Sequence, residues 1–235
     1  MISFKQRASL SELMDNPAGD RELLDRTLDQ LHVVNMFFSR NRYCAKKLLI
    51  PHMLRQQRKS FTVCDIGAGA CDFGLWLSGY AIRHGLRVHM YCVDNDIRVV
   101  EHARIKCRKN DLVTIIHDSA LNLASFAFKP DYIFSNHFIH HLSDTDLVKL
   151  FELIDMHASY GYVINDLKRS PISWTAFYLF GIVFLHKSFS LTDGLISIRR
   201  GFTEEELSGL LAKAGVADAR IENKWPGRLI ISKLR

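Results

Sequence analysis

The chain has 235 residues, of which 48% are hydrophobic and 24% are charged, and its formal net charge is +6. This composition is typical of a globular protein, and it excludes disordered, collagen-like and disulfide-stapled classes. A chain of this length buries enough surface to fold without a metal, and its five cysteines form no CxxC pair. We therefore expect buried, reduced thiols in a cytoplasmic protein without a secretory signal.

The positive charge is concentrated in the first quarter of the chain. Residues 1–60 carry 11 basic and 6 acidic side chains, whereas residues 61–235 carry 20 and 19. Residues 40–59 alone hold seven basic side chains and no acid. They form either a solvated helix face or a contact for an anionic partner. Aromatic residues that would stack on bases are nearly absent there, so we expect no nucleic-acid partner.

The longest uncharged stretch, residues 170–185, is shorter than the roughly 20 apolar residues that span a bilayer. It contains Pro171 and several hydroxyl side chains. We expect no stable membrane insertion, and at most a peripheral membrane contact.

Hydrophobic periodicity changes near residue 60. Apolar residues recur at helical spacing over residues 20–54 and predict one or two helices that end near Pro51. Beyond residue 60, short apolar runs alternate with amphipathic stretches, which is typical of βαβ units and a parallel sheet. The predicted strands cover residues 61–66, 87–93, 113–117, 131–135 and 160–164, and the last helix among them covers residues 144–157.

The last part of the chain predicts one more helix and a hairpin. Thr203 and Glu206 form a capping box, which opens a helix that ends near Gly215. Residues 216–222 and 228–233 follow as two antiparallel strands. The predicted fold is α/β: a Rossmann-like, doubly wound, seven-stranded sheet, mostly parallel with a closing antiparallel strand. N-terminal helices and a helical insertion after strand five complete it.

A glycine motif stands where the first strand turns into its helix. Asp65, Gly67 and Gly69 lie at the carboxyl edge of the sheet, where the backbone approaches ligands closely. A dinucleotide site would need a small residue at position 72, but this chain has Asp72. A carboxylate at the start of a helix repels a pyrophosphate and suits a cation.

This motif resembles the first motif of class I S-adenosylmethionine (SAM)-dependent methyltransferases, with Cys71 in place of the frequent third glycine. The resemblance implies SAM as the cofactor and S-adenosylhomocysteine (SAH) as the product. It implies that an acid after the second strand holds the ribose hydroxyls, and that polar groups after the third strand lie near the adenine. The residues that match these two positions are Asp94 with Asn95, and Asp118 with Ser119.

The region after the fourth strand resembles particular subgroups of methyltransferases. We assign Ser135, Asn136 and His137 to the cofactor site. The region lacks the Asn/Asp-Pro-Pro-Tyr/Phe sequence of methyltransferases that act on adenine amino groups. It resembles quinone-pathway enzymes and, more closely, bacterial methyltransferases found with type III polyketide synthases, which methylate phenolic products. The likeness extends to residues 13–17, 165–170 and 193–203.

A histidine cluster supplies candidates for a general base. Methyl transfer to a hydroxyl requires removal of a proton, and histidine has a suitable pKa. His140 and His141 are the candidate bases, whereas His137 is expected to line the SAM pocket. Asp166 could orient a histidine or bind the acceptor hydroxyl. We expect no metal site, because no carboxylate accompanies these histidines at standard ligand spacing.

An apolar segment over residues 173–185 is expected to pack in the core, to cover the acceptor or to contact a membrane. We divide the chain into a helical cap (residues 1–59) and a SAM-binding domain (residues 60–235) whose insertion, residues 170–202, forms an acceptor lid. Arg199 and Arg200 either meet an acidic acceptor or solvate a loop.

The predicted function is SAM-dependent transfer of a methyl group to a hydroxyl of a hydrophobic, aromatic or polyketide-type small molecule, with a biosynthetic synthase as a partner. The alternatives are C-methylation of a quinone precursor, RNA methylation through residues 40–59, and a non-catalytic subunit of a biosynthetic complex.

Overall fold

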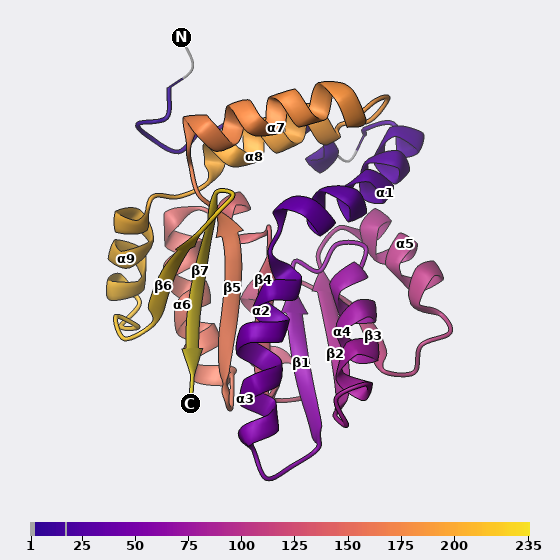
Figure 1. Ribbon diagram of the computed structural model, residues 1–235, viewed down its shortest axis with the longest axis vertical. Helices are drawn as coiled ribbons and strands as arrows, with labels where there is room; N and C mark the ends of the chain where they lie inside the picture. Colours follow the sequence, from indigo (N-terminus) through magenta and orange to yellow (C-terminus); the bar gives the residue numbers. More distant parts are fainter. Residues whose placement is uncertain (1–2, 17) are drawn as a thin grey trace.

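The computed structural model describes residues 3–16 and 18–235, apart from the side chains of His32, Met36 and Phe37. Pro17, which belongs to the block of resemblance at residues 13–17, lies outside the described residues. A seven-stranded sheet has the order β3-β2-β1-β4-β5-β7-β6, and β7 runs antiparallel to both of its neighbours (Figure 1). The predicted fold class is therefore confirmed. The strands are β1 Ser60–Ile66, β2 Arg87–Asp94, β3 Val113–His117, β4 Tyr132–Asn136, β5 Gly161–Leu167, β6 Arg220–Lys224 and β7 Arg228–Leu234.

Helices cover both faces of the sheet. Two large apolar clusters form the core: α2 to α5 contribute to one, and α6 and α9 contribute to the other. The longer helices are α1 Arg21–Phe38, α4 Asp72–Ile82, α5 Ile97–Cys107, α6 Asp144–His157, α7 Pro171–Phe184, α8 Ser190–Arg200 and α9 Glu204–Lys213. The shorter ones are η1 Leu13–Asp15, α2 Asn41–Cys44, η2 Ala45–Leu49, α3 Ile50–Arg55, η3 Ala120–Ser125 and η4 Ile139–His141.

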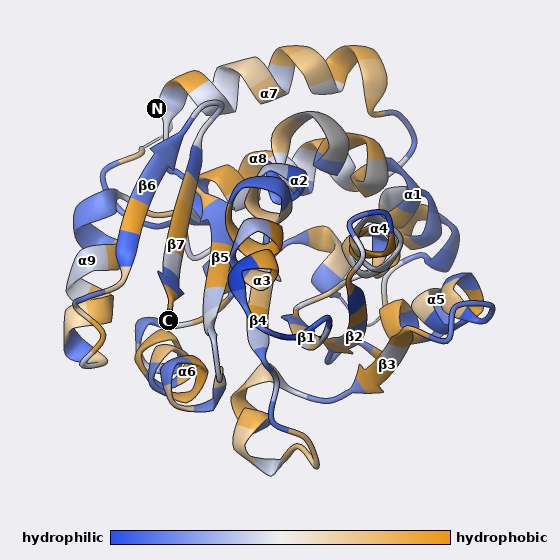
Figure 2. Ribbon diagram, turned by 60° about the horizontal axis from the view of Figure 1, so that its bottom comes forward, coloured by the Kyte–Doolittle hydropathy of each residue, from blue (hydrophilic) through white to orange (hydrophobic). Residues whose placement is uncertain are grey.

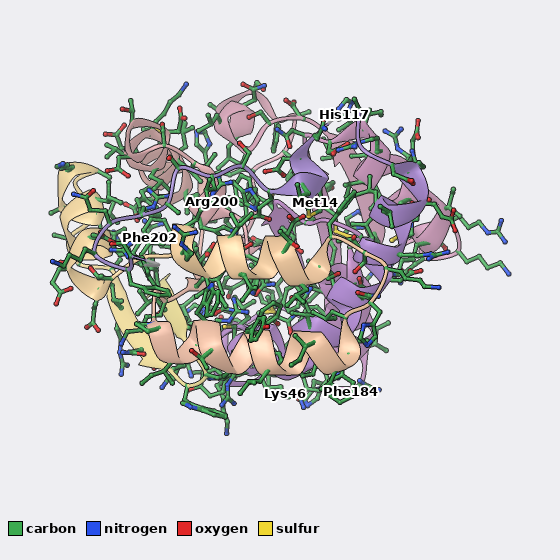
Figure 3. All side chains as sticks on the ribbon, turned by 90° about the horizontal axis from the view of Figure 1, so that it is seen from above. Met14, Lys46, His117, Phe184, Arg200 and Phe202 are labelled. Carbon is green, nitrogen blue, oxygen red and sulfur yellow. A yellow bond between two sulfur atoms is a disulfide. The ribbon has the colours of Figure 1, made fainter. Side chains whose placement is uncertain are left out.

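The carboxyl edge of the parallel strands is covered by elements outside the sheet. Helices α7 and α8 lie side by side across this edge, with α1 beside them (Figures 1 and 3). Phe38 of α1 packs edge-on against Phe177 and Phe180 of α7, at centroid distances of 5.9 and 4.9 Å. These helices therefore enclose the space above the glycine motif.

The prediction that the N-terminal helical region ends near Pro51 is wrong. Pro51 instead lies in the first turn of α3, which continues to Arg55. Proline has no N–H to donate to the preceding turn and normally ends a helix. Here Ala45–Leu49, the five residues before α3, form a π-helical turn. The i→i+5 bonding of that turn shifts the backbone pattern just before the proline, so the chain remains helical.

The prediction that every cysteine is a free thiol is wrong for two of them. Cys71, at the start of α4, and Cys92, in β2, form a disulfide beneath the glycine motif. Cys44, Cys64 and Cys107 are free and buried. Burial raises the pKa of the Cys44 thiol to about 12, which makes it unreactive.

Helix α7 is hydrophobic along most of its length but is not buried all round (Figure 2). Phe177 and Gly181 are its buried residues, while its outer face exposes Ile172, Tyr178, Leu179, Ile182, Val183 and Phe184. Among the described residues, no helix is long and apolar enough to cross a membrane. The first strand of the predicted hairpin begins later than expected, because residues 216–219 form a turn and β6 starts at Arg220. The second strand, β7, begins at Arg228 as predicted.

Candidate active site

A cavity of about 790 Å³ opens at the carboxyl ends of the parallel strands. Most of the residues predicted to bind the cofactor line it, namely Asp65, Gly67, Gly69, Asp72, Asp94, Asn95, Asp118, Ser119, Asn136 and His137. Ser135 does not line it. The Ser135 side chain is fully buried and donates a hydrogen bond to the carbonyl of Ile66 (3.0 Å), which ties β4 to β1.

Two contacts hold the glycine turn in place. Gly67 has φ +66°, and a Cβ atom there would lie 2.2 Å from the Phe138 ring, so a larger residue does not fit. The N–H of Gly69 donates to the carboxylate of Asp94 (2.9 Å), which also accepts from the N–H of Asp96 (3.1 Å). These bonds fix the turn against the end of β2 and present the Asp94 side chain to the cavity.

The cavity is rich in carboxylates. Burial raises the pKa of Asp65, and the nearby charge of Asp94 adds to this. Burial also raises the pKa of Asp94. Asp72 forms an ion pair with Lys106 (2.7 Å). Strands and turns thus bring acids from distant sequence positions to one cavity, an arrangement that favours a cationic ligand over a phosphate.

Asp166, at the end of β5, organises the histidine turn. One carboxylate oxygen accepts from the N–H groups of Phe138 (2.9 Å) and Ile139 (2.8 Å). The other oxygen accepts from Nδ1 of His140 (2.7 Å) and from the N–H of Leu167 (2.7 Å). Asp166 does not itself line the cavity. It therefore fixes both the backbone of η4 and the ring of His140.

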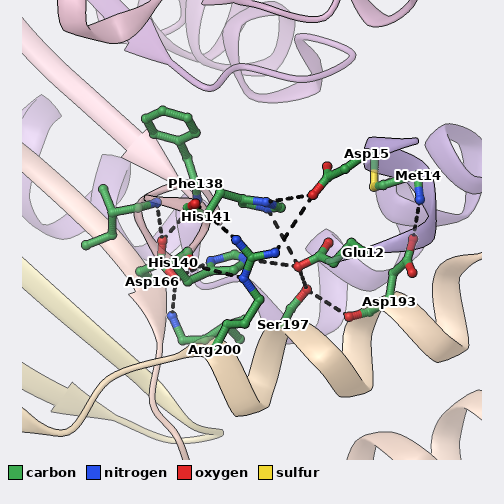
Figure 4. A network of polar contacts seen from close by, with 12 residues as sticks. Glu12, Met14, Asp15, Phe138, His140, His141, Asp166, Asp193, Ser197 and Arg200 are labelled. Carbon is green, nitrogen blue, oxygen red and sulfur yellow. Dashed lines mark hydrogen bonds and ion pairs between the residues drawn. The ribbon is translucent and has the colours of Figure 1, made fainter. Parts of the chain in front are cut away.

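Glu12 contacts the side of the His140 ring opposite Asp166 (Figure 4). The sequence did not predict Glu12 as a site residue. Its carboxylate is 3.5 Å from Nε2 of His140 and 3.8 Å from Nε2 of His141, and it accepts a hydrogen bond from Ser197 (2.7 Å). Glu12 is 5% exposed, although it lies in an irregular segment before η1. The one signal was its position next to residues 13–17, where the resemblance to known methyltransferases resumes.

The two carboxylates set the protonation of His140. Burial lowers the pKa of His140, but Asp166 and Glu12 outweigh this effect and raise it to about 9. Burial raises the pKa of Glu12, but the two histidines outweigh this effect and hold it at about 2. His137 has no carboxylate partner, and burial together with the Arg228 charge lowers its pKa well below the usual value. Their surroundings thus shift the pKa values of His140 and His137 in opposite directions.

His141 is more exposed than His140 and less tightly held. Its Nδ1 atom is 3.4 Å from a carboxylate oxygen of Asp15. Arg7 and Arg200 donate to the carbonyl oxygens at the end of η4, at distances of 3.0 to 3.2 Å. Arg200 therefore neither solvates a loop nor faces an acceptor, because it holds the turn that carries both histidines.

We expected no metal site because no carboxylate accompanies the histidines at standard ligand spacing, but the fold brings a distant carboxylate to them. Glu12, His140 and His141 each offer one ligand atom, and these atoms lie within 4.8 Å of one another. The carboxylate comes from a segment more than 120 residues away in sequence, so ligand spacing could not reveal it. The three side chains could hold a metal ion, using the same atoms that form the ion pairs described above.

A second, smaller cavity of about 70 Å³ lies among α1, α7, α8 and the start of β7. Phe38, Phe177 and Leu167 give it apolar walls. It meets the larger cavity at five residues that line both, which are Glu12, Met14, Leu31, His137 and Ser197. The region of contact between the two cavities lies directly beside the Glu12–His140 pair.

Comparisons with known proteins agree with this geometry. Residues 63–159 match the family model of the methyltransferase domain. No curated protein matches the chain in sequence. Human N-acetylserotonin methyltransferase, solved in complex with SAM, is similar in structure, with a TM-score of 0.63 and 14% identity; the match covers 92% of this chain and 56% of that one.

Two further solved structures are similar over nearly their full lengths. The plantazolicin methyltransferase BpumL, in complex with a triazolic desmethylPZN analog and SAH, has a TM-score of 0.65 and 14% identity, and the match covers 89% of this chain and 91% of that one. The magnesium protoporphyrin IX methyltransferase of Synechocystis, with bound SAH, has a TM-score of 0.53 and 13% identity, with coverages of 92% and 85%. These solved structures share the fold of the chain, and residues 63–159 are similar to a methyltransferase domain. The match to the family model begins in β1 and ends just after α6.

Proposed function

We propose that this protein is a SAM-dependent methyltransferase that transfers a methyl group to a hydroxyl of a hydrophobic, aromatic small molecule. One observation carries the proposal. The acid-lined cavity meets the apolar cavity beside a buried Asp166–His140–Glu12 chain of carboxylate, imidazole and carboxylate. A cationic cofactor, an apolar acceptor and a strong base can therefore meet at one place.

The residues of the larger cavity suit the three parts of SAM. Asp94 stands at the end of β2 with its carboxylate fixed by two N–H donors, and we assign it to the ribose hydroxyls. Asp118 and Ser119 follow β3, and we assign them to the adenine. Asp65, Gly67 and Gly69 line the part of the cavity next to Phe138, which we assign to the methionine end.

His140 acts as the general base in this proposal. SAM supplies an electrophilic methyl group, which passes to the acceptor oxygen while the sulfonium becomes the neutral sulfide of SAH. The hydroxyl proton passes to Nε2 of His140, and Asp166 keeps Nδ1 protonated and stabilises the imidazolium that forms. A pKa of about 9 matches a phenol, whose ordinary pKa is about 10. Such a base favours an aromatic hydroxyl acceptor.

The helices above the sheet would select the acceptor. We propose that residues 1–59 act as a cap and residues 170–202 as a lid, because Leu31, Phe38 and Phe177 from these regions line the apolar cavity. A synthase that delivers an aromatic product would be a suitable partner. The exposed face of α7 would suit a transient contact with such a partner or with a membrane surface.

Calorimetry and variant kinetics test the proposal. SAM and SAH should bind and NAD should not, since a pyrophosphate would meet the carboxylates of the cavity. His140→Ala should lower the turnover of hydroxylated aromatic probes by about 100- to 10,000-fold with SAM affinity unchanged. His141→Ala is the matched control, with a smaller loss. Binding of NAD in place of SAM, or full activity of the His140 variant, would refute the assignment.

Product analysis separates O-methylation from C-methylation. The mass increases by one methylene group in both cases, but the carbon–proton correlation of the new methyl group differs between an ether and a carbon bond. We expect the ether signature. A methyl group bound to carbon would instead support the quinone-precursor alternative with the same cofactor site.

A further inference from the structure

Arg228, the first residue of β7, is buried, and no carboxylate of the described residues forms an ion pair with it. Its side chain is 1% exposed and ranks among the largest fully buried side chains. Nε donates to the carbonyl of Phe38 (2.7 Å), but Nη1 has no hydrogen-bond partner among the described residues. Arginine stays protonated in proteins and offers five donors. A buried guanidinium with an unused donor points to a ligand that the protein alone does not provide.

No carboxylate of the described residues lies within ion-pair distance of Arg228. Asp166 is near enough to act through its charge, but its oxygens are occupied by three backbone N–H groups and by His140. A buried charge without a partner is costly, so an anion that enters the cavity would gain a strong interaction there. Arg228 therefore differs from Arg169, which is equally buried but pairs with Glu206 through two hydrogen bonds (2.9 and 2.7 Å).

Arg228 lines the 70 Å³ cavity, and a second unpartnered polar group lines it too. The hydroxyl of Ser190, at the start of α8, is buried and finds no hydrogen-bond partner in the part of the chain that the structure describes. Two acids border the same cavity, but their charges are engaged elsewhere. Asp193 accepts from the N–H groups of Leu13 and Met14 (2.7 and 3.0 Å), and Glu12 faces the histidines.

We propose that Arg228, assisted by Ser190, binds an anionic oxygen of the methyl acceptor, so that the preferred acceptors are hydroxylated aromatic acids. This inference rests on the proposed function and names its substrate class. The cavity is smaller than the roughly 150 Å³ that holds a benzene ring in an engineered apolar site. A carboxylate fits into it, and the aromatic ring then lies where the two cavities meet. The acceptor hydroxyl is thereby directed towards His140.

Matched acceptor pairs test this assignment in the full-length protein. Hydroxybenzoic acids with the hydroxyl at each ring position are compared with the corresponding hydroxybenzamides, which have nearly the same shape and no charge. We expect kcat/KM to favour the acid by about 100-fold in the unmodified protein. The Arg228→Met variant should lose most of this preference, mainly through KM, and Arg228→Lys should retain part of it.

Two controls keep the outcome interpretable. Arg199→Met removes another guanidinium of the lid, one that is partly exposed and lines neither cavity, and it should preserve the acid preference. Calorimetry of acid and amide with the unmodified protein and SAH needs no variant to fold. Equal affinity for acid and amide, or an unchanged preference in Arg228→Met, would overturn the role of Arg228. Amide methylation with SAM would still support the proposed function in that case, whereas failure to bind SAM would refute that function itself.

Discussion

Each carboxylate oxygen of Asp166 accepts two hydrogen bonds, so one side chain fixes both the η4 backbone and a histidine ring. The sequence indicated that Asp166 could orient a histidine or bind the acceptor hydroxyl, because Asp166 and the histidines stand at strand ends on one edge of a parallel sheet. It could not identify Glu12, whose segment has no regular hydrophobic pattern and reaches the site through tertiary contacts. Residues placed by strand order were predictable, whereas a residue placed by packing was not.

The charge state of His140 predicts how the activity depends on pH. In the proposed mechanism the neutral imidazole is the base, and Asp166 and Glu12 raise its pKa to about 9. The neutral fraction grows about tenfold per pH unit below that value, so kcat/KM should rise from pH 6 and level off near pH 9. Replacing Glu12 by Gln removes one of the two charges and should move the rising limb to lower pH. A flat profile between pH 6 and 9 would contradict the role of His140.

The same shift has a consequence for stability. A histidine with a raised folded pKa stabilises the protein fully below its unfolded pKa of about 6.5, and this contribution is lost as the pH rises through about 9. Thermal unfolding of the unmodified protein should therefore occur at lower temperature at pH 9.5 than at pH 7. The difference should shrink in the Glu12→Gln variant.

Substitution of Asp166 by Asn tests the orientation of the histidine. An amide cannot accept all four hydrogen bonds, and it no longer selects the tautomer with a proton on Nδ1. We expect kcat to fall by about 100- to 10,000-fold while SAM affinity stays the same, as measured by steady-state kinetics and calorimetry. Asp29→Asn, an exposed position on α1, serves as the control and should be neutral. Near-normal turnover in Asp166→Asn would exclude a positioning role.

At the level of elements, α7 and α8 pack closely against each other at two glycines, one on each helix. A Cβ atom at Gly194 would lie 2.3 Å from the Phe177 ring, and a Cβ atom at Gly181 would lie 2.4 Å from the side chain of Leu191. The sequence predicted a helical insertion here, but it treated the apolar segment as one uniform surface. Which face would be buried depended on these contacts, and no periodic pattern in residues 173–185 could reveal it.

Gly194→Ala should therefore weaken the lid. Overpacking at this contact is expected to cost about 1–3 kcal/mol, and the melting temperature should fall by roughly 2–4 °C for each kcal/mol. The KM for aromatic acceptors should rise as well, since Phe177 and Gly194 both line the apolar cavity. The control is Gly209→Ala in α9, where no atom lies within 4 Å of an added Cβ. That change should be neutral or slightly stabilising. An unchanged melting temperature in Gly194→Ala would show that α7 and α8 accommodate the added methyl group without loss of stability.

Across the whole molecule, the basic region at residues 40–59 is partly used for internal packing. Arg42 and Lys46 lie over the rings of Trp76 and Tyr80, at 5.3 and 5.5 Å from the ring centroids. Arg58 pairs with Asp131 (3.0 Å). The net charge was visible in the sequence, but its use was not, because the aromatic partners lie in a later helix. Because these basic side chains contact other parts of the protein, we interpret residues 40–59 as a helix face that packs on the sheet domain. A nucleic-acid-binding surface would leave them free.

We therefore expect weak binding to RNA. At about 0.15 M salt, the Kd for a structured RNA should be no tighter than the roughly 1–100 µM of non-specific electrostatic binding. The measurement is fluorescence anisotropy over a series of salt concentrations. Nanomolar binding, or strong competition between RNA and a hydroxybenzoic acid for the site, would favour the RNA methyltransferase alternative.

The position of β7 between β5 and β6 has a consequence for the order in which the protein matures. Arg228 and the cap residue Glu12 are more than 200 positions apart, yet both border the acceptor cavity. The glycine turn, β2 and β3 are synthesised long before β7 can pair with β5. The larger cavity is lined by residues up to Ser197, whereas the smaller cavity lacks one wall until β7 has paired with β5. Under the proposed function, the chain would thus form its cofactor site before its acceptor site is complete.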